Sequence, residues 1–224
     1  MKNVLVTGAN KGIGLAIVKA LLDHNYTVIA VSRNDENLNS IKSDRLRIFK
    51  VDLQNLEEIE AFLKKLSELG INIDVLINNA GIGVFGNVET LSWDNWRQVL
   101  DLNLSVPFYL TNYVIPKMKE QNYGRIINIG SDDDSKAEVG ASAYCASKFG
   151  LLGLTQCVRL ETQGYNIGVT TISPGRVDTF FNSKYPGCRP NALKDIDIAK
   201  QVIFVLDMDE RCNIEEIRLS SNLE

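Results

Sequence analysis

Tyr144 and Lys148 are the pair in this sequence most capable of acid–base chemistry, and they are four residues apart in a predicted helix. At that spacing both side chains lie on one face of the helix. A phenol has a reference pKa near 10, so bringing it to about 7 requires roughly 4 kcal/mol of preferential stabilisation of the phenolate. One ammonium about 4 Å away, at an effective dielectric constant of about 20, supplies that order of energy. Without further context such a pair is more often an ordinary amphipathic face.

Ser131 stands thirteen residues before Tyr144 and is followed by three aspartates, Asp132, Asp133 and Asp134. If the alternation of the preceding strand continues past the serine, Asp133 points to the same side as Ser131 and its two neighbours point away. The ordinary interpretation is a solvated turn whose aspartates accept bonds from backbone N–H groups. The alternatives are an acidic subsite that favours neutral or cationic substrates, and a divalent metal site, which needs further oxygen ligands.

A glycine-rich turn, TGANKGIG at residues 7–14, separates the first predicted strand from a helix. Gly8, Gly12 and Gly14 let the backbone approach a pyrophosphate, and the helix N-terminus supplies N–H groups and partial positive charge. The spacing differs from the usual G-x-G-x-x-G, and many such turns need a glycine only for steric reasons. The position after the first strand nevertheless favours nucleotide binding.

The second strand ends in VIAVSRND, where dinucleotide-binding folds place an acid that accepts from the ribose 2′-hydroxyl. Ser32 stands at that place and Arg33 follows it, while Lys11 lies in the glycine turn. Two cations here could flank a 2′-phosphate, so the sequence predicts NADP(H) in preference to NAD(H). The alternative is that both cations are solvated and that Asp35 reaches the ribose.

Short β-branched runs alternate with helical patterns along the chain. The predicted strands are 3–7, 26–32, 46–52, 73–78, 124–130, 167–173 and 214–220, and the predicted helices lie near 12–24, 35–43, 55–69, 92–120, 142–164 and 195–206. This alternation predicts an α/β, doubly wound (Rossmann) domain with a seven-stranded parallel sheet of order 3-2-1-4-5-6-7 and helices on both faces. Ligands of such sheets bind at the carboxyl ends of the strands, where the motifs above lie.

The 224 residues, 45% of them hydrophobic, suffice for one core, and we expect a single domain over residues 1–224. The net charge of −4, without a Lys/Arg block, predicts a small-molecule substrate and neither nucleic acid nor a membrane as partner. The first apolar run is too short for a signal peptide or a spanning helix, so we expect a cytoplasmic protein with reduced cysteines. His24 is the only histidine, which argues against a histidine triad, and we predict no metal.

The motifs TGANKGIG (7–14), NNAG (78–81), Asn103, Ser131, YCASK (144–148) and SPGRVDT (173–179) together resemble the short-chain dehydrogenase/reductase family in its single-domain form. They follow the family's order and spacing over nearly the whole chain, which makes coincidence improbable.

The resemblance implies that Tyr144 is the general acid in carbonyl reduction and that Ser131 hydrogen-bonds the same oxygen. It also implies that Lys148 lowers the pKa of Tyr144 and holds the nicotinamide ribose, and that Asn103 anchors a water in a proton relay. Pro107 has no N–H, so a helix over 103–107 would leave the Asn103 carbonyl without its i+4 partner and open to that water. The plainer alternative is that Pro107 only kinks the helix.

The resemblance further implies that Asp52 takes the adenine amino group, that NNAG lines the adenosine side, and that the SPGRVDT segment seats the carboxamide. The predicted cofactor residues are therefore Gly8, Asn10, Lys11, Gly12, Ile13, Gly14, Ser32, Arg33, Asp52, Leu53, Asn79, Ala80, Gly81, Tyr144, Lys148, Pro174, Gly175, Val177 and Thr179. The predicted substrate contacts are Ser131, Asp133 and Tyr144. A proline-rich and glycine-containing stretch predicts a substrate lid near 176–194, which would form the pocket with residues near 85–95 and 132–140.

The expected function is NADP(H)-dependent reduction of a ketone or aldehyde, with 3-oxoacyl thioesters among the possible substrates. The alternatives are a non-catalytic NADP-binding sensor or partner-binding protein, and a sugar or polyol dehydrogenase. Two departures from the family pattern stand out: Gly130 replaces a serine that is frequent there, and the chain ends without a glycine pair that often feeds a tetramer interface. The apolar helix near 142–164 favours a homodimer, with a tetramer in doubt.

Overall fold

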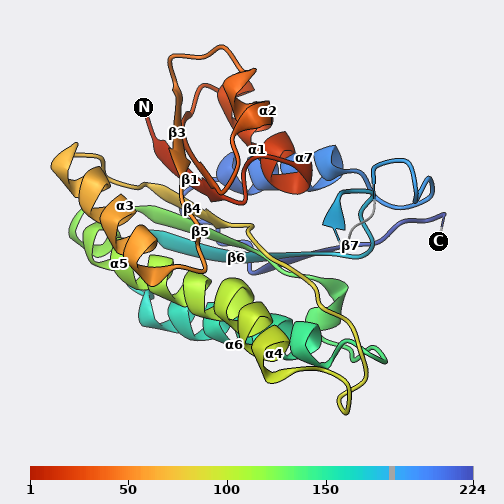
Figure 1. The fold of residues 1–224 in the computed structure, drawn as a ribbon. Helices are drawn as coiled ribbons and strands as arrows, with labels where there is room; N and C mark the ends of the chain where they lie inside the picture. The colour runs from red at the N-terminus through yellow and green to blue at the C-terminus, as the bar shows by residue number, and fades with distance from the viewer. Residues whose placement is uncertain (182–184, 224) are drawn as a thin grey trace.

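The computed structural model describes residues 1–181 and 185–223, and this part of the chain is built on a sheet of seven parallel strands (Figure 1). The strands are β1 (Asn3–Thr7), β2 (Thr27–Ser32), β3 (Leu46–Lys50), β4 (Val75–Asn78), β5 (Gly124–Ile129), β6 (Ile167–Pro174) and β7 (Glu216–Leu219). Their order is β3-β2-β1-β4-β5-β6-β7, so the predicted topology is confirmed. The winding reverses between β1 and β4, which pair in parallel.

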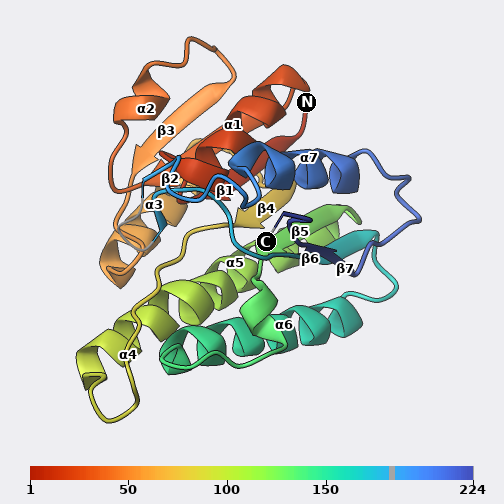
Figure 2. The ribbon, with the colours of Figure 1, turned by 90° about the vertical axis from the view of Figure 1, so that its right-hand side faces the viewer.

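Helices cover both faces of the sheet (Figures 1 and 2). One face carries α1 (Gly12–Asp23), α2 (Glu36–Asn39) and α7 (Asp195–Leu206), and the other carries α3 (Leu56–Glu68), α4 (Trp93–Leu100), α5 (Val106–Glu120) and α6 (Ser142–Glu161). Within β1, Val4 and Val6 belong to the core under α1 and α7, whereas Leu5 belongs to the core under α3 and α5. Because both faces are covered, the central strands carry apolar residues on both sides, and their polar residues, such as Arg125 and Asn128 in β5, are buried as well.

The long predicted helix 92–120 is interrupted by a π-helical segment, η1 (Asp101–Ser105), between α4 and α5. Pro107 accounts for a break at this place, since it has no N–H to donate to the carbonyl four residues back. Short π-helical segments often occur at functional sites. Here the segment carries Asn103.

Other boundaries differ from the prediction in smaller ways. The helix predicted at 35–43 is only the four residues of α2, because Leu38 is its one buried residue and no apolar stripe supports a longer helix. The helix predicted at 142–164 ends at Glu161, and Gly164 follows with a φ of +86°. No helix in the described part of the chain is both long and apolar enough to cross a membrane.

Candidate active site

The glycine turn packs closely against the loop that follows β4. A Cβ on Gly14 would lie 2.2 Å from the carbonyl oxygen of Gly8, and Gly8 itself has a φ of +65°. The Asn79 amide donates to the carbonyls of Thr7 at 2.8 Å and Gly8 at 3.3 Å, and the backbone N–H groups of Asn79 and Ala80 donate to the Thr7 hydroxyl. These bonds fix the shape of the turn at the point where the winding reverses.

The N-terminus of α1 fits a pyrophosphate. Lys11, which precedes the helix, is extended and provides no side-chain cap, so within the described residues the first-turn N–H groups are left for an anion. Gly12 has a φ of +52°, and a Cβ there would lie 3.4 Å from Thr179, so the turn faces the segment after β6. The turn and the SPGRVDT segment therefore border the same space.

The cations predicted to meet a 2′-phosphate lie at the surface beside this turn. Lys11 and Arg33 are exposed, and Lys11 Nζ lies 5.6 Å from the centre of the Phe180 ring. Asp35 is 3.8 Å from Lys50 Nζ, so it already has a cationic partner. The Asn10 side chain caps α2, because its Oδ1 accepts from the N–H groups of Asn37 and Leu38.

Further residues predicted to bind the cofactor lie in the loops after β3 and β6. Asp52 Oδ1 accepts from the N–H of Gln54 at 3.0 Å, and Leu53 is buried. After β6, Gly175 donates to the Leu219 carbonyl at 2.8 Å and Val177 pairs with Leu193. Residues 182–184 of the stretch predicted as a lid lie outside the described residues.

Tyr144 and Lys148 are both buried on α6, as their spacing predicts. The Tyr144 ring lies between Phe85 and Phe181, with ring centres 5.8 and 5.7 Å away. Lys148 Nζ lies 5.7 Å from the centre of the Tyr144 ring and donates to the Ile129 carbonyl at 2.8 Å. The structure thus brings the ammonium, the phenol and the end of β5 together.

The electrostatics of the pair differ from the expectation that Lys148 lowers the pKa of Tyr144. Burial raises the pKa of Tyr144 above its usual value; the hydrogen bond with Ser131 opposes this, and the charge of Asp133 adds to it. Burial lowers the pKa of Lys148 to about 8, and the charge of Asp134 opposes that change. Loss of water around both groups therefore outweighs their mutual interaction.

Asn103 is buried, and its side chain joins the loop after β4 to α6 by hydrogen bonds. Its Oδ1 accepts from the Ile82 N–H at 2.9 Å, and its Nδ2 donates to the Ile82 carbonyl at 2.9 Å and to Ser147 Oγ at 3.0 Å. Ser147 Oγ in turn donates to the Tyr144 carbonyl at 2.7 Å. The chain is helical through this region, so Pro107 leaves the Asn103 carbonyl without an α-helical partner, as the sequence predicts.

The three aspartates do not continue a strand, and the alternation expected past Ser131 is wrong. β5 ends at Ile129, and residues 132–134 form a 3-10 turn in which Ser131 Oγ accepts from the Asp133 N–H at 3.2 Å. Asp132 forms an exposed ion pair with Lys136 at 2.7 Å, whereas Asp133 and Asp134 are buried. The solvated-turn interpretation therefore holds for Asp132 only.

The charge of Asp133 contributes to the raised pKa of the Tyr144 phenol. Burial raises the pKa of the Asp133 carboxyl itself, and the charges of Asp132 and Glu138 add to that effect. Among the described residues, no group of three His, Cys, Asp or Glu side chains is arranged to hold a metal ion.

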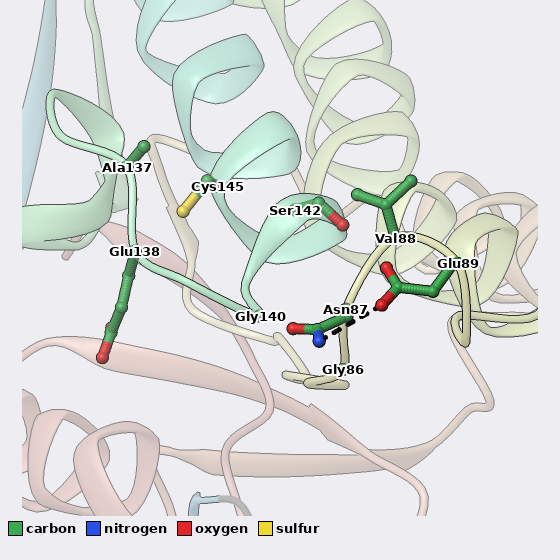
Figure 3. A pocket seen from close by; sticks show the side chains of 9 residues that line it. All are labelled: Gly86, Asn87, Val88, Glu89, Ala137, Glu138, Gly140, Ser142 and Cys145. Carbon is green, nitrogen blue, oxygen red and sulfur yellow. Dashed lines mark hydrogen bonds between the residues drawn. The ribbon is translucent and has the colours of Figure 1, made fainter.

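A pocket of about 320 Å³ opens between residues 86–89 and 137–145 (Figure 3). Gly86 donates to the Gly140 carbonyl at 2.7 Å and joins the two segments. Glu89, Glu138 and Cys145 are among the lining residues, and Cys145 directly follows Tyr144 in the chain. Both segments overlap the ranges predicted for the substrate pocket.

Some residues around the site had no signal in the sequence. Phe85 and Phe181 come from loops without periodicity, and Arg218 comes from the last strand. Ser147 lies inside the YCASK motif, so the motif could have directed attention to it.

The family model for short chain dehydrogenases matches residues 2–187 of the chain. Together with the sheet order and the grouping of the motifs, this match shows that the chain belongs to the short-chain dehydrogenase/reductase family, a family of oxidoreductases.

Among individual proteins, the chain is 32% identical over 231 residues to the NADP-dependent 3-hydroxy acid dehydrogenase YdfG of Escherichia coli K12, with 96% of this chain and 93% of that protein covered. It matches the closed form of a serine dehydrogenase complexed with NADP+ at a TM-score of 0.92 and 32% identity, covering 99% of this chain and 96% of the other. It matches a 4-hydroxyisoleucine dehydrogenase complexed with NADH at a TM-score of 0.91 and 31% identity, covering 99% and 98%.

Proposed function

We propose that the protein transfers hydride between NADP(H) and the carbonyl or alcohol group of a small substrate. The observation that carries this proposal is the buried Tyr144 phenol, which lies close to Ser131 and to the Lys148 ammonium. A protein that only bound a nucleotide would have no need of a buried phenol paired with an ammonium. The nicotinamide, when bound, would supply or accept the hydride.

Ser131 would donate to the substrate oxygen. Its Oγ accepts from the Asp133 N–H at 3.2 Å, which leaves its own O–H to donate elsewhere. Before a substrate binds, that O–H can be shared with the Tyr144 oxygen and with Asp132 Oδ1, which is 3.4 Å away and already paired with Lys136. Tyr144 would give its proton to the same oxygen as negative charge develops there, and Ser131 would stabilise that charge.

Lys148 would organise the proton supply. One of the three protons on Nζ is donated to the Ile129 carbonyl, so two are left for a ribose hydroxyl and for a water. The Asn103 carbonyl, which Pro107 leaves without an α-helical partner, would hold that water. The Asn103 side chain is engaged with Ile82 and Ser147 and would act only by fixing the backbone.

For the substrate we propose a ketone or aldehyde, or the corresponding alcohol, with a neutral or cationic group toward Asp133. The 3-hydroxy acid dehydrogenase and the 4-hydroxyisoleucine dehydrogenase that the chain resembles act, by their names, on acids, which carry a carboxylate. In this chain the charge of the buried Asp133 acts on the phenol, and Glu89 and Glu138 line the pocket. A carboxylate on the substrate would meet like charge from these residues.

The catalytic proposal is tested by following NADPH oxidation with a broad panel of carbonyl compounds. Tyr144→Phe should lose turnover by about 100-fold or more while it still binds NADPH. Tyr113→Phe is the matched control, because the partners of the Tyr113 hydroxyl among the described residues are Leu63 and Ser67, which lie outside the site. Full turnover in Tyr144→Phe, or no turnover of any compound by the wild type, would favour the alternative of a non-catalytic NADP-binding protein.

The cofactor proposal is tested by fluorescence titration with NADPH and NADH. NADP(H) is favoured because Ser32 replaces the usual acid and because Arg33 and Lys11 are exposed beside the glycine turn. Arg33→Ser should weaken NADPH binding by about tenfold or more and leave NADH binding unchanged. Arg211→Ser is the control, since Arg211 is exposed and pairs with Asp209. Equal binding of both cofactors by the wild type would contradict the proposal.

The substrate proposal is tested with pairs of ketones that differ only in a carboxylate. Asp133→Asn should raise turnover of the carboxylate-bearing member relative to the neutral one, because it removes the buried like charge. An unchanged ratio would remove Asp133 from the substrate site. A homodimer and a cytoplasmic location are retained as predictions, and analytical ultracentrifugation would test the dimer.

A further inference from the structure

Asp134 is a buried carboxylate that has no role in the chemistry proposed above. Its side chain is 0% exposed, and it accepts from Arg218 Nη2 at 2.9 Å and from the Ser173 hydroxyl. Arg218 comes from β7 and Ser173 from β6, so the carboxylate joins the turn after β5 to the two following strands. A buried charge is costly unless it is paired, and this one is held by an arginine and a hydroxyl.

Gly130 makes room for this carboxylate. A Cβ on Gly130 would lie 2.8 Å from Asp134 Oδ2, 2.7 Å from Ser173 Oγ and 2.9 Å from Thr171. A serine at this place, as the family pattern has it, would displace the Asp134 carboxylate. The two unusual residues of this segment, Gly130 and Asp134, therefore depend on one another.

The carboxylate and the Lys148 ammonium lie at the same peptide group. Lys148 Nζ is 2.8 Å from the Ile129 carbonyl, while Asp134 Oδ2 occupies the space next to the Gly130 Cα. The charge of Asp134 is the one that opposes the effect of burial on the Lys148 pKa. Without it, only unfavourable desolvation would act on the ammonium.

We propose that Asp134, held by Arg218 and Ser173, is a positioning residue that keeps Lys148 charged beside Tyr144. Arg218 in turn keeps Asp134 ionised, and Glu216 pairs with the same arginine. The groups that contact the carboxylate are Arg218 and Ser173, its charge acts on Lys148, and Asp133 is the neighbouring acid. The importance of this charge interaction for catalysis rests on the proposed function, whereas the charge state of Lys148 can be measured without a substrate.

The direct test is an NMR pH titration of protein labelled with 13C at the lysine Cε, with the Lys148 signal assigned by its loss in Lys148→Arg. Asp134→Asn keeps the shape of the side chain and removes its charge, so the Lys148 midpoint should fall by about one unit. Arg211→Met, which also removes one half of an Arg–Asp pair, should leave that midpoint unchanged. An unchanged midpoint in a folded Asp134→Asn protein would overturn the proposal, because a purely structural role would not move the titration.

A second variant covers the case in which Asp134→Asn fails to fold. Arg218→Met removes the charge that keeps Asp134 ionised, so the Lys148 midpoint should fall, as it does in Asp134→Asn. A midpoint that is unchanged or higher would contradict the proposal. Arg218 is 42% exposed, which makes this variant the milder perturbation of the fold.

The kinetic test separates this proposal from the proposed function. With an active wild type, the fall in turnover at high pH should move to lower pH in Asp134→Asn, together with the NMR midpoint. A wild type without NADPH-dependent turnover would contradict the proposed function and leave the NMR result standing. An active wild type whose pH profile and NMR midpoint are unaffected by Asp134→Asn would contradict the role of Asp134 alone.

Discussion

Replacing Asn103 with alanine tests how much of this site depends on a buried amide. The change removes three hydrogen bonds, two to the Ile82 backbone and one to Ser147, at donor–acceptor distances of 2.9, 2.9 and 3.0 Å. Each such bond contributes about 1 kcal/mol net, so the free energy of unfolding should fall by roughly 3 kcal/mol. In a domain of this size that corresponds to a drop of about 6 to 12 °C in the melting temperature.

Urea unfolding followed by tryptophan fluorescence measures this loss, and a thermal scan checks the shift in melting temperature. Asn166→Ala is the matched control, because its side chain makes one exposed bond to Glu210 and should change stability by about 0.5 kcal/mol or less. A loss of less than about 1 kcal/mol in Asn103→Ala would show that Ile82 and Ser147 find other hydrogen-bond partners. The Asn103 side chain would then not be an important source of stability.

The same variant bears on the proposed proton relay. The relay would use the main-chain carbonyl of residue 103, which alanine retains, so the variant leaves the water-binding atom in place. A loss of turnover in Asn103→Ala would therefore report the displacement of Ile82 and of the Tyr144 backbone that Ser147 holds. NADPH affinity and turnover measured below the melting temperature separate cofactor binding from proton transfer.

Three further predictions concern the loops around the site. Gly14→Ala should weaken NADPH binding by about tenfold or more in a fluorescence titration, because its Cβ would lie 2.2 Å from the Gly8 carbonyl oxygen and move the turn. Gly130→Ala should lower the urea midpoint, because its Cβ would meet three atoms at 2.7 to 2.9 Å, whereas a Cβ on the control Gly153 meets nothing within 4 Å. Three donors hold the pKa of Asp178 below its usual value, with Lys194 contributing most, so its stabilising effect is present above about pH 4 and lost at lower pH. Asp178→Asn should therefore make stability depend less on pH in that acid range.

The topology of the sheet could be predicted from the sequence because each central strand is buried on both faces. Strands such as NVLVT and GRIINI have apolar residues on both sides and therefore no side that must face water. A parallel sheet between two layers of helices is the arrangement that buries both sides. The type and position of the helix break at η1 could not be predicted in the same way. Pro107 predicts a lost hydrogen bond, but whether the chain kinks or widens into a π-helix depends on contacts such as that between Asn103 and Ile82.

The grouping of Ser131, Tyr144 and Lys148 could likewise be predicted, because the spacing along α6 and the position at the end of β5 are local properties of the chain. The balance of charge around them could not. It depends on burial, which raises the pKa of Tyr144 and lowers that of Lys148 to about 8, and burial is set by Phe85, Phe181 and the packing of α6.

The aspartates show why formal charge in a sequence is a poor guide to the field in a site. Arg218, which is 84 residues from Asp134 in the sequence, donates a hydrogen bond to its carboxylate. Lys136, four residues after Asp132, forms an ion pair with it. Asp133 forms no ion pair with any of the described residues, and of the acids near Tyr144 its charge contributes most to raising the pKa of the phenol. An acid at this place works against Tyr144 as a proton donor and acceptor near neutral pH, since it stabilises the protonated phenol.

The cationic or neutral group that we propose for the substrate would remove that conflict by pairing with or covering Asp133. Asp133→Asn should accordingly lower the pH at which Tyr144 titrates in the free enzyme and reduce the preference against carboxylates, and the two effects should appear together.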